Sequence, residues 1–383
     1  MAAEPRVQGW CPGAWRPMAS GDGLLVRVRP YQGRLTRAQL LALCDAADTF
    51  GSGLIELTNR ANLQLRGVAE SAWPGLMTVL ADQGLLDPDP ATESRRNVLL
   101  VPDWQTGDAS DEAARLLLAC LPELPELPGK LGFAVDAGAE PVLGEASADF
   151  RIERATTGAL LVRADGRALG TPVDSVAAAV DLLVRLAHWF VESGGQASGR
   201  MRRHRALLPA WAPASIRPAD ARSQLALGTH PQGVLYGLPF GRAPAAVLRA
   251  AVAPARVTGV RLTPWRRLLV EGAEAQLLHG LLTDNRDPRL ATDACPGAPR
   301  CGQASVATLG LAERLSGRVG GPVHVSGCRK GCARRQPAAL CLTGRAGRFD
   351  LIVGGRADGT PVAAGLTESE VFAYLENIDA PRL

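Results

Sequence analysis

The chain has 383 residues, of which 46% are apolar and 21% are charged, and its formal net charge is +4. A chain of this length exceeds the size of a single core, so we expect two or more domains. We find no run of about 18 uncharged apolar residues, and therefore expect no membrane span. Residues 1–30 lack an apolar signal region, which favours a cytoplasmic protein.

The basic residues are nearly all arginines, because Lys130 and Lys330 are the only two lysines. Arginine is the side chain that pairs with carboxylates through two parallel hydrogen bonds. The small net charge disfavours nucleic acid as a partner. The composition therefore indicates an anionic small molecule as the ligand.

The N-terminal part of the chain predicts a strand, an amphipathic helix and two further strands. The strands are expected at 23–29, 53–58 and 62–66, and the helix at 36–50. The same order returns later, with strands at 233–238, 258–263 and 267–270 and a helix at 244–253. Each copy is too small to bury both faces of its sheet, so we expect the copies to pack about a pseudo-two-fold axis. Two coincidental β-α-β stretches are the alternative.

The segments that follow each copy also correspond, although more weakly. The first set predicts strands at 97–101, 131–135 and 159–163 and a helix at 111–121. The second set predicts a helix at 303–315 and strands at 322–325 and 339–342. Between the sets lie a helix at 174–191, a basic turn at 199–205 and a linker rich in Pro and Ala at 209–218.

These patterns predict an α+β protein built from four parts. Two duplicated half-domains pack together, and two related α/β lobes accompany them. We expect the first half-domain at 1–90, the first lobe at 91–215, the second half-domain at 216–290 and the second lobe at 291–383.

Four cysteines in the last part of the chain form a C-x5-C…C-x3-C array, made of Cys295, Cys301, Cys328 and Cys332. Four thiolates are what a 4Fe-4S cluster requires. Zinc is the competing ligand, but four-cysteine zinc sites favour tighter spacings. The helix expected at 303–315 would turn its first N–H groups toward the cluster sulfurs.

The other four cysteines are less informative. Cys44, Cys120 and Cys341 lie in apolar runs and are most simply buried side chains. Cys11 heads the tripeptide Cys-Pro-Gly that recurs at Cys295, and its role stays open.

The chain resembles the sulfite and nitrite reductase superfamily, whose members hold a sirohaem against a 4Fe-4S cluster. The resemblance rests on the duplicated halves, the stretch 57–67, the tract 96–98 and the paired cysteines. It implies that the half-domains are ferredoxin-like. Within the superfamily the chain is most similar to the precorrin-3B synthases, through the stretches 11–25 and 324–333.

Three departures separate the chain from the reductases. Arg60-Ala61 and Arg66 replace an Arg-Gln pair and a His, Ala339 replaces an acidic residue, and Gly132 replaces the second lysine of a K-x-K near Lys130. Without paired lysines, a reductase would lack charge stabilisation for its oxyanion substrate.

The resemblance implies an oxidoreductase, a monooxygenase that takes precorrin-3A, O2 and electrons from an NADH-dependent donor. Hydroxylation at C20 and closure of a γ-lactone by the ring A acetate would give precorrin-3B, in aerobic cobalamin biosynthesis. It also implies a mononuclear non-haem iron, but none of the five histidines stands at a ligand spacing from another. No catalytic residue can be named. A sirohaem-dependent sulfite or nitrite reductase, in which Cys332 bridges cluster and haem, is the alternative, and a tetrapyrrole carrier without enzyme activity is a third.

Candidate ligands for the substrate's acetate and propionate groups follow from the repeat. Strand alternation places four polar side chains of the first half-domain on one face, while two arginines of the second half-domain and one lysine of the first lobe face the same cleft. The candidates are Arg60, Asn62, Gln64, Arg66, Lys130, Arg266 and Arg267.

Overall fold

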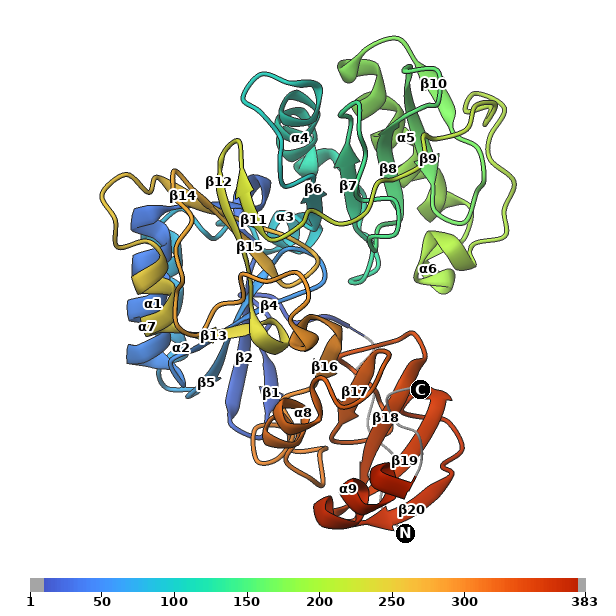
Figure 1. The fold of residues 1–383 in the computed structure, drawn as a ribbon. Helices are drawn as coiled ribbons and strands as arrows, with labels where there is room; N and C mark the ends of the chain where they lie inside the picture. Colours follow the sequence, from blue (N-terminus) through green and yellow to red (C-terminus); the bar gives the residue numbers. More distant parts are fainter. Residues whose placement is uncertain (1–9, 378–383) are drawn as a thin grey trace.

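The computed structural model describes residues 10–377, and the strands in this range form four five-stranded sheets. Figure 1 shows two sheets side by side next to helices α1 (Arg37–Phe50) and α7 (Ala245–Ala251). The third sheet lies above them and the fourth below. The fold is therefore α+β with several sheets, as the sequence predicts.

The first two sheets exchange one strand with each other. The first has the order β1 (Met18–Ser20), β2 (Gly23–Val28), β5 (Leu63–Val68), β4 (Leu54–Leu57), β13 (Arg242–Pro244). The second has the order β11 (Gly228–His230), β12 (Gly233–Gly237), β15 (Arg267–Glu271), β14 (Gly259–Leu262), β3 (Arg34–Thr36). Thus β13 of the second half completes the first sheet, and β3 of the first half completes the second.

The predicted repeat is confirmed in atomic detail by a turn that both halves share. In each half a threonine hydroxyl accepts hydrogen bonds from the backbone N–H groups two and four residues ahead. Thr58 accepts from Arg60 (3.3 Å) and Asn62 (3.1 Å), and Thr263 accepts from Trp265 (3.3 Å) and Arg267 (3.1 Å). The residue between the two donors has positive φ in both turns, 51° at Ala61 and 61° at Arg266.

The core between the halves is formed by α1 and α7, which pack on each other. Thr36 caps α1: its hydroxyl accepts from the N–H of Gln39, whose side chain accepts from the N–H of Thr36. Leu40, Leu43 and Cys44 of α1 are fully buried. Because the two helices face each other across the pseudo-two-fold axis, each sheet gains the cover that it could not supply alone.

The two α/β lobes have the same strand topology. The first contains β6 (Val98–Leu100), α4 (Ala109–Ala119), β7 (Phe133–Asp136), β8 (Phe150–Arg154), β9 (Leu160–Ala164), β10 (Thr171–Val173) and α5 (Val176–Glu192). The second contains β16 (Thr292–Ala294), α8 (Leu309–Leu315), β17 (Val323–Ser326), β18 (Ala338–Arg345), β19 (Arg348–Gly355), β20 (Ala363–Leu366) and α9 (Glu368–Asn377). In both lobes two parallel pairings are followed by two antiparallel ones.

Short helices connect these parts. They are α2 (Trp73–Asp82), α3 (Pro90–Arg95), α6 (Gly195–Ser198) and the 3-10 turns η1 (Tyr31–Gly33), η2 (Leu121–Glu123), η3 (Met201–Arg203), η4 (Pro239–Gly241) and η5 (Pro288–Ala291). None of the helices in the described range is long and apolar enough to cross a bilayer. The four domain boundaries expected from the sequence stay a prediction.

One predicted helix is shorter than expected, because α8 begins at Leu309 and not at residue 303. The backbone before it is bound elsewhere: the N–H of Ser305 donates to Gly327 (3.0 Å), and the carbonyl of Val306 accepts from Ala298 (2.8 Å). These bonds hold residues 303–306 in a loop. The helix start therefore lies at Thr308–Leu309, next to the carbonyl of Cys295, and its orientation toward the cluster sulfurs stays a prediction.

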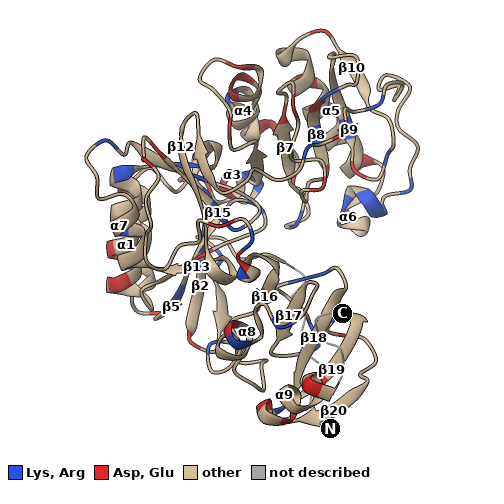
Figure 2. Ribbon diagram, viewed as in Figure 1, with Lys and Arg blue, Asp and Glu red and all other residues tan. Residues whose placement is uncertain are grey.

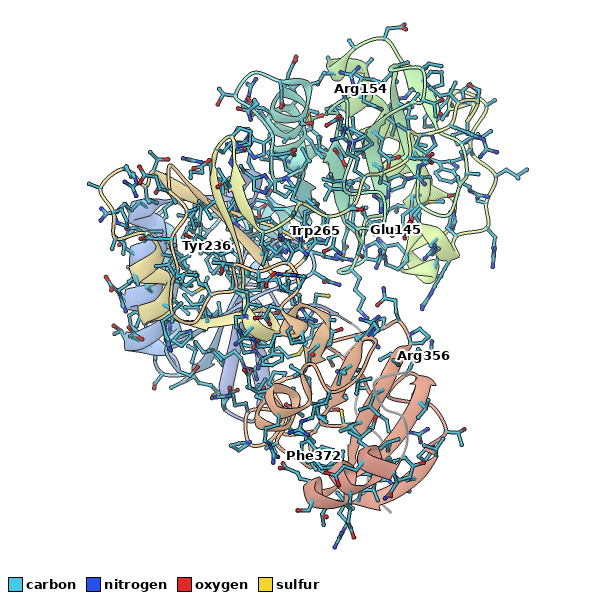
Figure 3. All side chains as sticks on the ribbon, in the orientation of Figure 1. Glu145, Arg154, Tyr236, Trp265, Arg356 and Phe372 are labelled. Carbon is cyan, nitrogen blue, oxygen red and sulfur yellow. The ribbon has the colours of Figure 1, made fainter. Side chains whose placement is uncertain are left out.

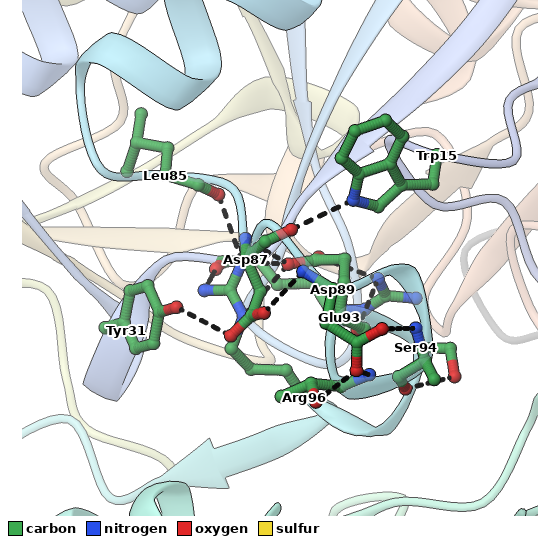
Figure 4. A network of polar contacts seen from close by, with 11 residues as sticks. Trp15, Tyr31, Leu85, Asp87, Asp89, Glu93, Ser94 and Arg96 are labelled. Carbon is green, nitrogen blue, oxygen red and sulfur yellow. Dashed lines mark hydrogen bonds and ion pairs between the residues drawn. The ribbon is translucent and has the colours of Figure 1, made fainter. Parts of the chain in front are cut away.

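A buried network of charges ties the first half-domain to α3 (Figure 4). Glu93 forms ion pairs with Arg29 (3.0 Å) and with Arg96, and all three side chains are at least nine-tenths buried. Arg96 also donates to the carbonyls of Arg29 and Leu85 and lies over the ring of Tyr31. The family tract 96–98 thus begins with an arginine that serves packing.

Replacement of Glu93 by Gln is expected to lower the free energy of unfolding by about 3 kcal/mol, because two buried guanidiniums lose their carboxylate. Urea denaturation measures the loss. The control is Glu368→Gln, which removes an exposed pair with Arg314 and is expected to cost less than about 1 kcal/mol. Equal losses in the two variants would contradict the structural role of Glu93.

Candidate functional site

Parallel pairing of β16 with β17 brings the two cysteine segments together. Ala294 lies opposite Val325, so both strands end at the same edge of the sheet. Cys295 directly follows β16, and Cys328 comes two residues after β17. The first cysteine of each pair is therefore placed by the register of this sheet.

Hydrogen bonds then connect the two segments. The N–H of Gly327 donates to Sγ of Cys295 (3.0 Å), and the hydroxyl of Thr308 donates to the carbonyl of Cys295 (2.6 Å). A Cβ at residue 327 would lie 2.5 Å from Cβ of Ala304, so only glycine allows this approach. Backbone donors to sulfur are a common feature of iron-sulfur sites.

The four thiols lie close enough together to interact electrostatically. Burial raises the pKa of Cys328, and the nearby Cys295 and Cys301 raise it further. Burial also raises the pKa of Cys332, and the nearby Cys295 and Cys328 raise it further. A nearby cation would offset this rise and favour the thiolates of Cys328 and Cys332.

The spread of the thiols bears on which metal they suit. In the part of the chain that the structure describes, no three His, Cys, Asp or Glu side chains converge closely enough to hold a single metal ion. Zinc needs its thiolates within about 2.3 Å of one ion. In a 4Fe-4S cube each thiolate binds a different iron, so the sulfurs stand further apart. A cube and a zinc ion thus differ in the thiolate spacing that they require, and the choice between them stays a prediction.

The first half-domain supports the cysteine loop through Arg66. Its guanidinium donates to the carbonyl of Arg300 (2.8 Å), and the hydroxyl of Ser20 donates to the same oxygen (2.8 Å). Asp22 balances the charge of Arg66 at 3.1 Å, and Glu56 lies 3.7 Å away. Arg66 is 3% exposed, so it acts from behind the loop.

A cleft of about 2180 Å³ opens beside Cys328 and Cys332. Its walls come from both half-domains and both lobes, and Figure 3 places two lining residues, Glu145 and Trp265, near the middle of the molecule. Figure 2 shows basic residues next to α6, on the side of the first lobe that faces β16–β20. A cavity of this size between parts of the chain suits a large ligand.

The described lining of the cleft is strongly basic. Twelve arginines and both lysines line it, against four carboxylates. The basic residues are Arg27, Lys130, Arg151, Arg163, Arg167, Arg200, Arg202, Arg203, Arg266, Arg329, Lys330, Arg334, Arg335 and Arg345, and the acidic ones are Glu145, Asp165, Asp293 and Asp358. Such a surface attracts an anion with several negative charges.

Of the seven candidates for substrate binding, Lys130 and Arg266 line the cleft. Arg266 donates to the carbonyl of Ala333, next to Cys332, and pairs with Asp293. Arg60 lies just behind the wall and donates to the carbonyl of Lys130 (2.6 Å) and the hydroxyl of Ser147 (3.4 Å). Burial lowers the pKa of Arg60 to about 10.

The other four candidates do not line the cleft. Asn62 is buried, Gln64 bridges Arg27 and Glu56, Arg66 holds the cysteine loop, and Arg267 donates to the carbonyl of Leu225. Strand alternation fails for Arg60 and Asn62, because they belong to the Thr58 turn and β5 begins only at Leu63. These positions support the cleft from behind.

Sequence reasoning missed most of the arginines that line the cleft. Arg151 and Arg163 face each other on β8 and β9, and both interact with Glu153. Arg200 and the residues after it form the basic turn, and the high content of basic residues in this segment could have indicated that it lines the cleft. Their convergence depends on how the lobes pack, which no local pattern reveals.

The remaining cysteines are placed as follows. Cys11 lines the cleft and interacts with the guanidinium of Arg27. Cys44 and Cys341 are fully buried, as expected, and burial raises their pKa to about 12 and about 11. Cys120 is partly exposed because it caps the end of α4, so the expectation that it is buried is wrong.

The five histidines do not assemble. His324 is fully buried beside Cys341, and burial lowers its pKa to about 4. His204 lies in the first lobe between Ser193 and Ser198, and His188 contacts the carbonyl of Glu123. His230 contacts the carbonyl of Ala226, and His279 lies in an exposed loop. The described residues therefore offer no facial triad for a mononuclear iron.

Comparison with known proteins agrees with this geometry. Residues 16–83 match the family model of the nitrite/sulfite reductase ferredoxin-like half domain. A precorrin-3B synthase from Sinorhizobium sp. is 35% identical over 93% of this chain and 85% of its own length. The chain belongs to the precorrin-3B synthase family.

Sequence matches to sulfite reductases are shorter. The haemoprotein beta-component of an NADPH-dependent sulfite reductase from Xylella fastidiosa (strain 9a5c) is 30% identical over 30% of this chain and 23% of its own length. The NirA protein of Mycobacterium tuberculosis superposes with a TM-score of 0.62 at 20% identity, over 94% of this chain and 81% of NirA. This structural likeness establishes the shared fold.

The role of Arg66 behind the cysteine loop can be tested with Arg66→Met. We expect faster amide exchange at residues 298–303, because the carbonyl of Arg300 loses one of its two donors and Asp22 loses its charge partner. Hydrogen-exchange mass spectrometry measures this. Arg318→Met, on the exposed end of the same lobe, should leave the loop unchanged. Unaltered exchange in both variants would remove Arg66 from the support of the loop.

Proposed function

We propose that this protein is a precorrin-3B synthase, a monooxygenase of aerobic cobalamin biosynthesis. It would convert precorrin-3A to precorrin-3B by hydroxylation at C20, with the ring A acetate closing a γ-lactone. One atom of O2 enters the product and the other leaves as water, so the reaction takes up two electrons and two protons. An NADH-dependent partner would supply the electrons.

The observation that carries this proposal is the basic cleft beside the cysteine array. Precorrin-3A is a macrocycle edged with acetate and propionate groups, and its size and charge suit a cleft of about 2180 Å³ lined by arginines. Cys328 and Cys332 lie on the cleft wall, so electrons that arrive there have a short path to a bound macrocycle.

The four cysteines Cys295, Cys301, Cys328 and Cys332 would hold a 4Fe-4S cluster. When bound, such a cluster passes electrons one at a time. Gly327 would donate its N–H to the sulfur of Cys295. Arg266 would fix the backbone at Ala333, next to Cys332. The residues at hand fit this cofactor.

A mononuclear iron, which the family resemblance implies, has no ligand set among the described residues. We therefore assign no step of the reaction to it. The residues that we do assign act on the substrate: the lining cations bind and orient its carboxylates.

The structure argues against a sirohaem-dependent reductase at one position. Reductases carry a second lysine where this chain has Gly132. A Cβ at residue 132 would lie 2.4 Å from Nδ2 of Asn97, and Asn97 is itself bound to the carbonyl of Leu131 (2.8 Å). A lysine could enter only if the side-chain amide of Asn97 moved aside, so the packing at this position disfavours the paired-lysine arrangement.

Purified protein is expected to contain about four irons and four sulfides per chain, and to show a broad brown absorption shoulder. Cys328→Ser should lose this absorption, while Cys120→Ser, outside the cluster lobe, should keep it. A Soret band with a red band would identify sirohaem and favour the reductase. Full iron and sulfide in Cys328→Ser would overturn the ligand assignment.

The activity itself is tested by incubating the protein in air with precorrin-3A and a reducing system. We expect a product heavier by one oxygen atom, and none from Cys328→Ser. Precorrin-3A that binds but is returned unchanged would favour a carrier and contradict the proposed reaction.

A further inference from the structure

The cations of the cleft fall into two kinds. Some already face a carboxylate of the protein: Arg163 binds Glu153 through two bonds (2.7 and 2.8 Å), Arg200 pairs with Asp149 (2.8 Å) and Arg334 with Asp293 (2.9 Å). Others have no acidic partner within the described range, and among them are Lys130, Arg202 and Arg203. Only the second kind offers its full charge to a ligand.

Arg202 and Arg203 belong to a turn that is anchored at its start. Asp149 is fully buried, and one of its oxygens accepts from the guanidinium of Arg200 (2.8 Å) and from the N–H of Met201 (2.9 Å). Its other oxygen accepts from the N–H of Gly132 (3.0 Å). A single buried carboxylate thus ties the turn to the segment that carries Lys130.

The same turn is anchored at its end by His204. Its two ring nitrogens bond to the hydroxyls of Ser193 (2.8 Å) and Ser198 (3.1 Å), and its ring packs edge-on against Trp189 and Phe190. Burial lowers the pKa of His204, which keeps the ring neutral, so one nitrogen donates and the other accepts. The hydroxyls therefore hold the ring in one orientation.

Between these two anchors, Arg202 and Arg203 are exposed and line the cleft. We call Arg200–His204 the anchored basic turn. Like charges held together without an anion repel one another, and a fixed backbone prevents the turn from moving away. An anionic ligand relieves this repulsion, and its binding costs little conformational entropy because the turn is already ordered.

We propose that Arg202, Arg203 and Lys130 bind peripheral carboxylates of the tetrapyrrole and so set the orientation of the macrocycle against the cluster lobe. This inference rests on the proposed function for the identity of the ligand. The arginines that face internal carboxylates, such as Arg163, would shape the cleft without binding the substrate directly.

The test is the affinity of the holoprotein for uroporphyrin, a stable tetrapyrrole with acetate and propionate groups, measured by quenching of its fluorescence. The double variant Arg202→Ala/Arg203→Ala is expected to bind about 10-fold more weakly, since two partly solvated ion pairs are lost. Its affinity should also depend less on salt concentration. Arg205→Ala is the matched control: Arg205 is exposed and follows the turn directly, but it does not line the cleft.

Iron and sulfide content equal to that of the wild type shows that the double variant is folded. Wild-type affinity in the double variant, or an equal loss in Arg205→Ala, would overturn the inference. Because the assay measures binding and not turnover, its outcome is separable from that of the proposed function. If the double variant binds uroporphyrin more weakly as expected but the wild-type protein forms no precorrin-3B, the inference stands and the proposed reaction does not.

Discussion

The position of the cleft depends on the reciprocal exchange of β3 and β13. Each half-domain completes the sheet of the other, through pairings such as Leu35 with Val260 and Ala243 with Ile55. Neither sheet is whole without its partner, so the two halves cannot shift independently. The lobes are attached to this fixed pair, and the arginines of the first lobe and the cysteines of the second are thereby held on opposite sides of one cavity.

Much of the fold could be predicted because local sequence patterns indicate its helices and strands. The order of strands and helix in residues 23–66, which returns in residues 233–270, indicated the repeat, and the structure shows the same hydrogen-bonded turn at Thr58 and Thr263. The strand exchange could not be predicted, because β3 and β13 are three residues long and look like parts of a loop. The length of α8 was missed for a related reason, since bonds from Ser305 and Val306 to distant segments override the helical pattern.

The candidate site was predicted unevenly. Spacing alone singled out the four cysteines, whose role as cluster ligands stays a prediction, whereas five of the seven proposed substrate ligands do not line the cleft. Arg66 illustrates the difficulty. It lies in the family motif, but its guanidinium already pairs with Asp22 and donates to the carbonyl of Arg300 in the cysteine loop. An arginine becomes available to a ligand only where no internal carboxylate faces it. Whether a carboxylate faces an arginine depends on tertiary packing. For the same reason, the sequence showed the anchored basic turn only as a cluster of basic residues.

The central claim is that a thiolate-held cluster lies on the wall of the cavity that binds the macrocycle. Pulsed electron paramagnetic resonance of the reduced protein with bound copper uroporphyrin tests this claim most directly. The account predicts strong dipolar coupling between the copper spin and the cluster spin, and its loss in Cys328→Ser. A porphyrin that binds with no coupling to a fully assembled cluster would contradict the account.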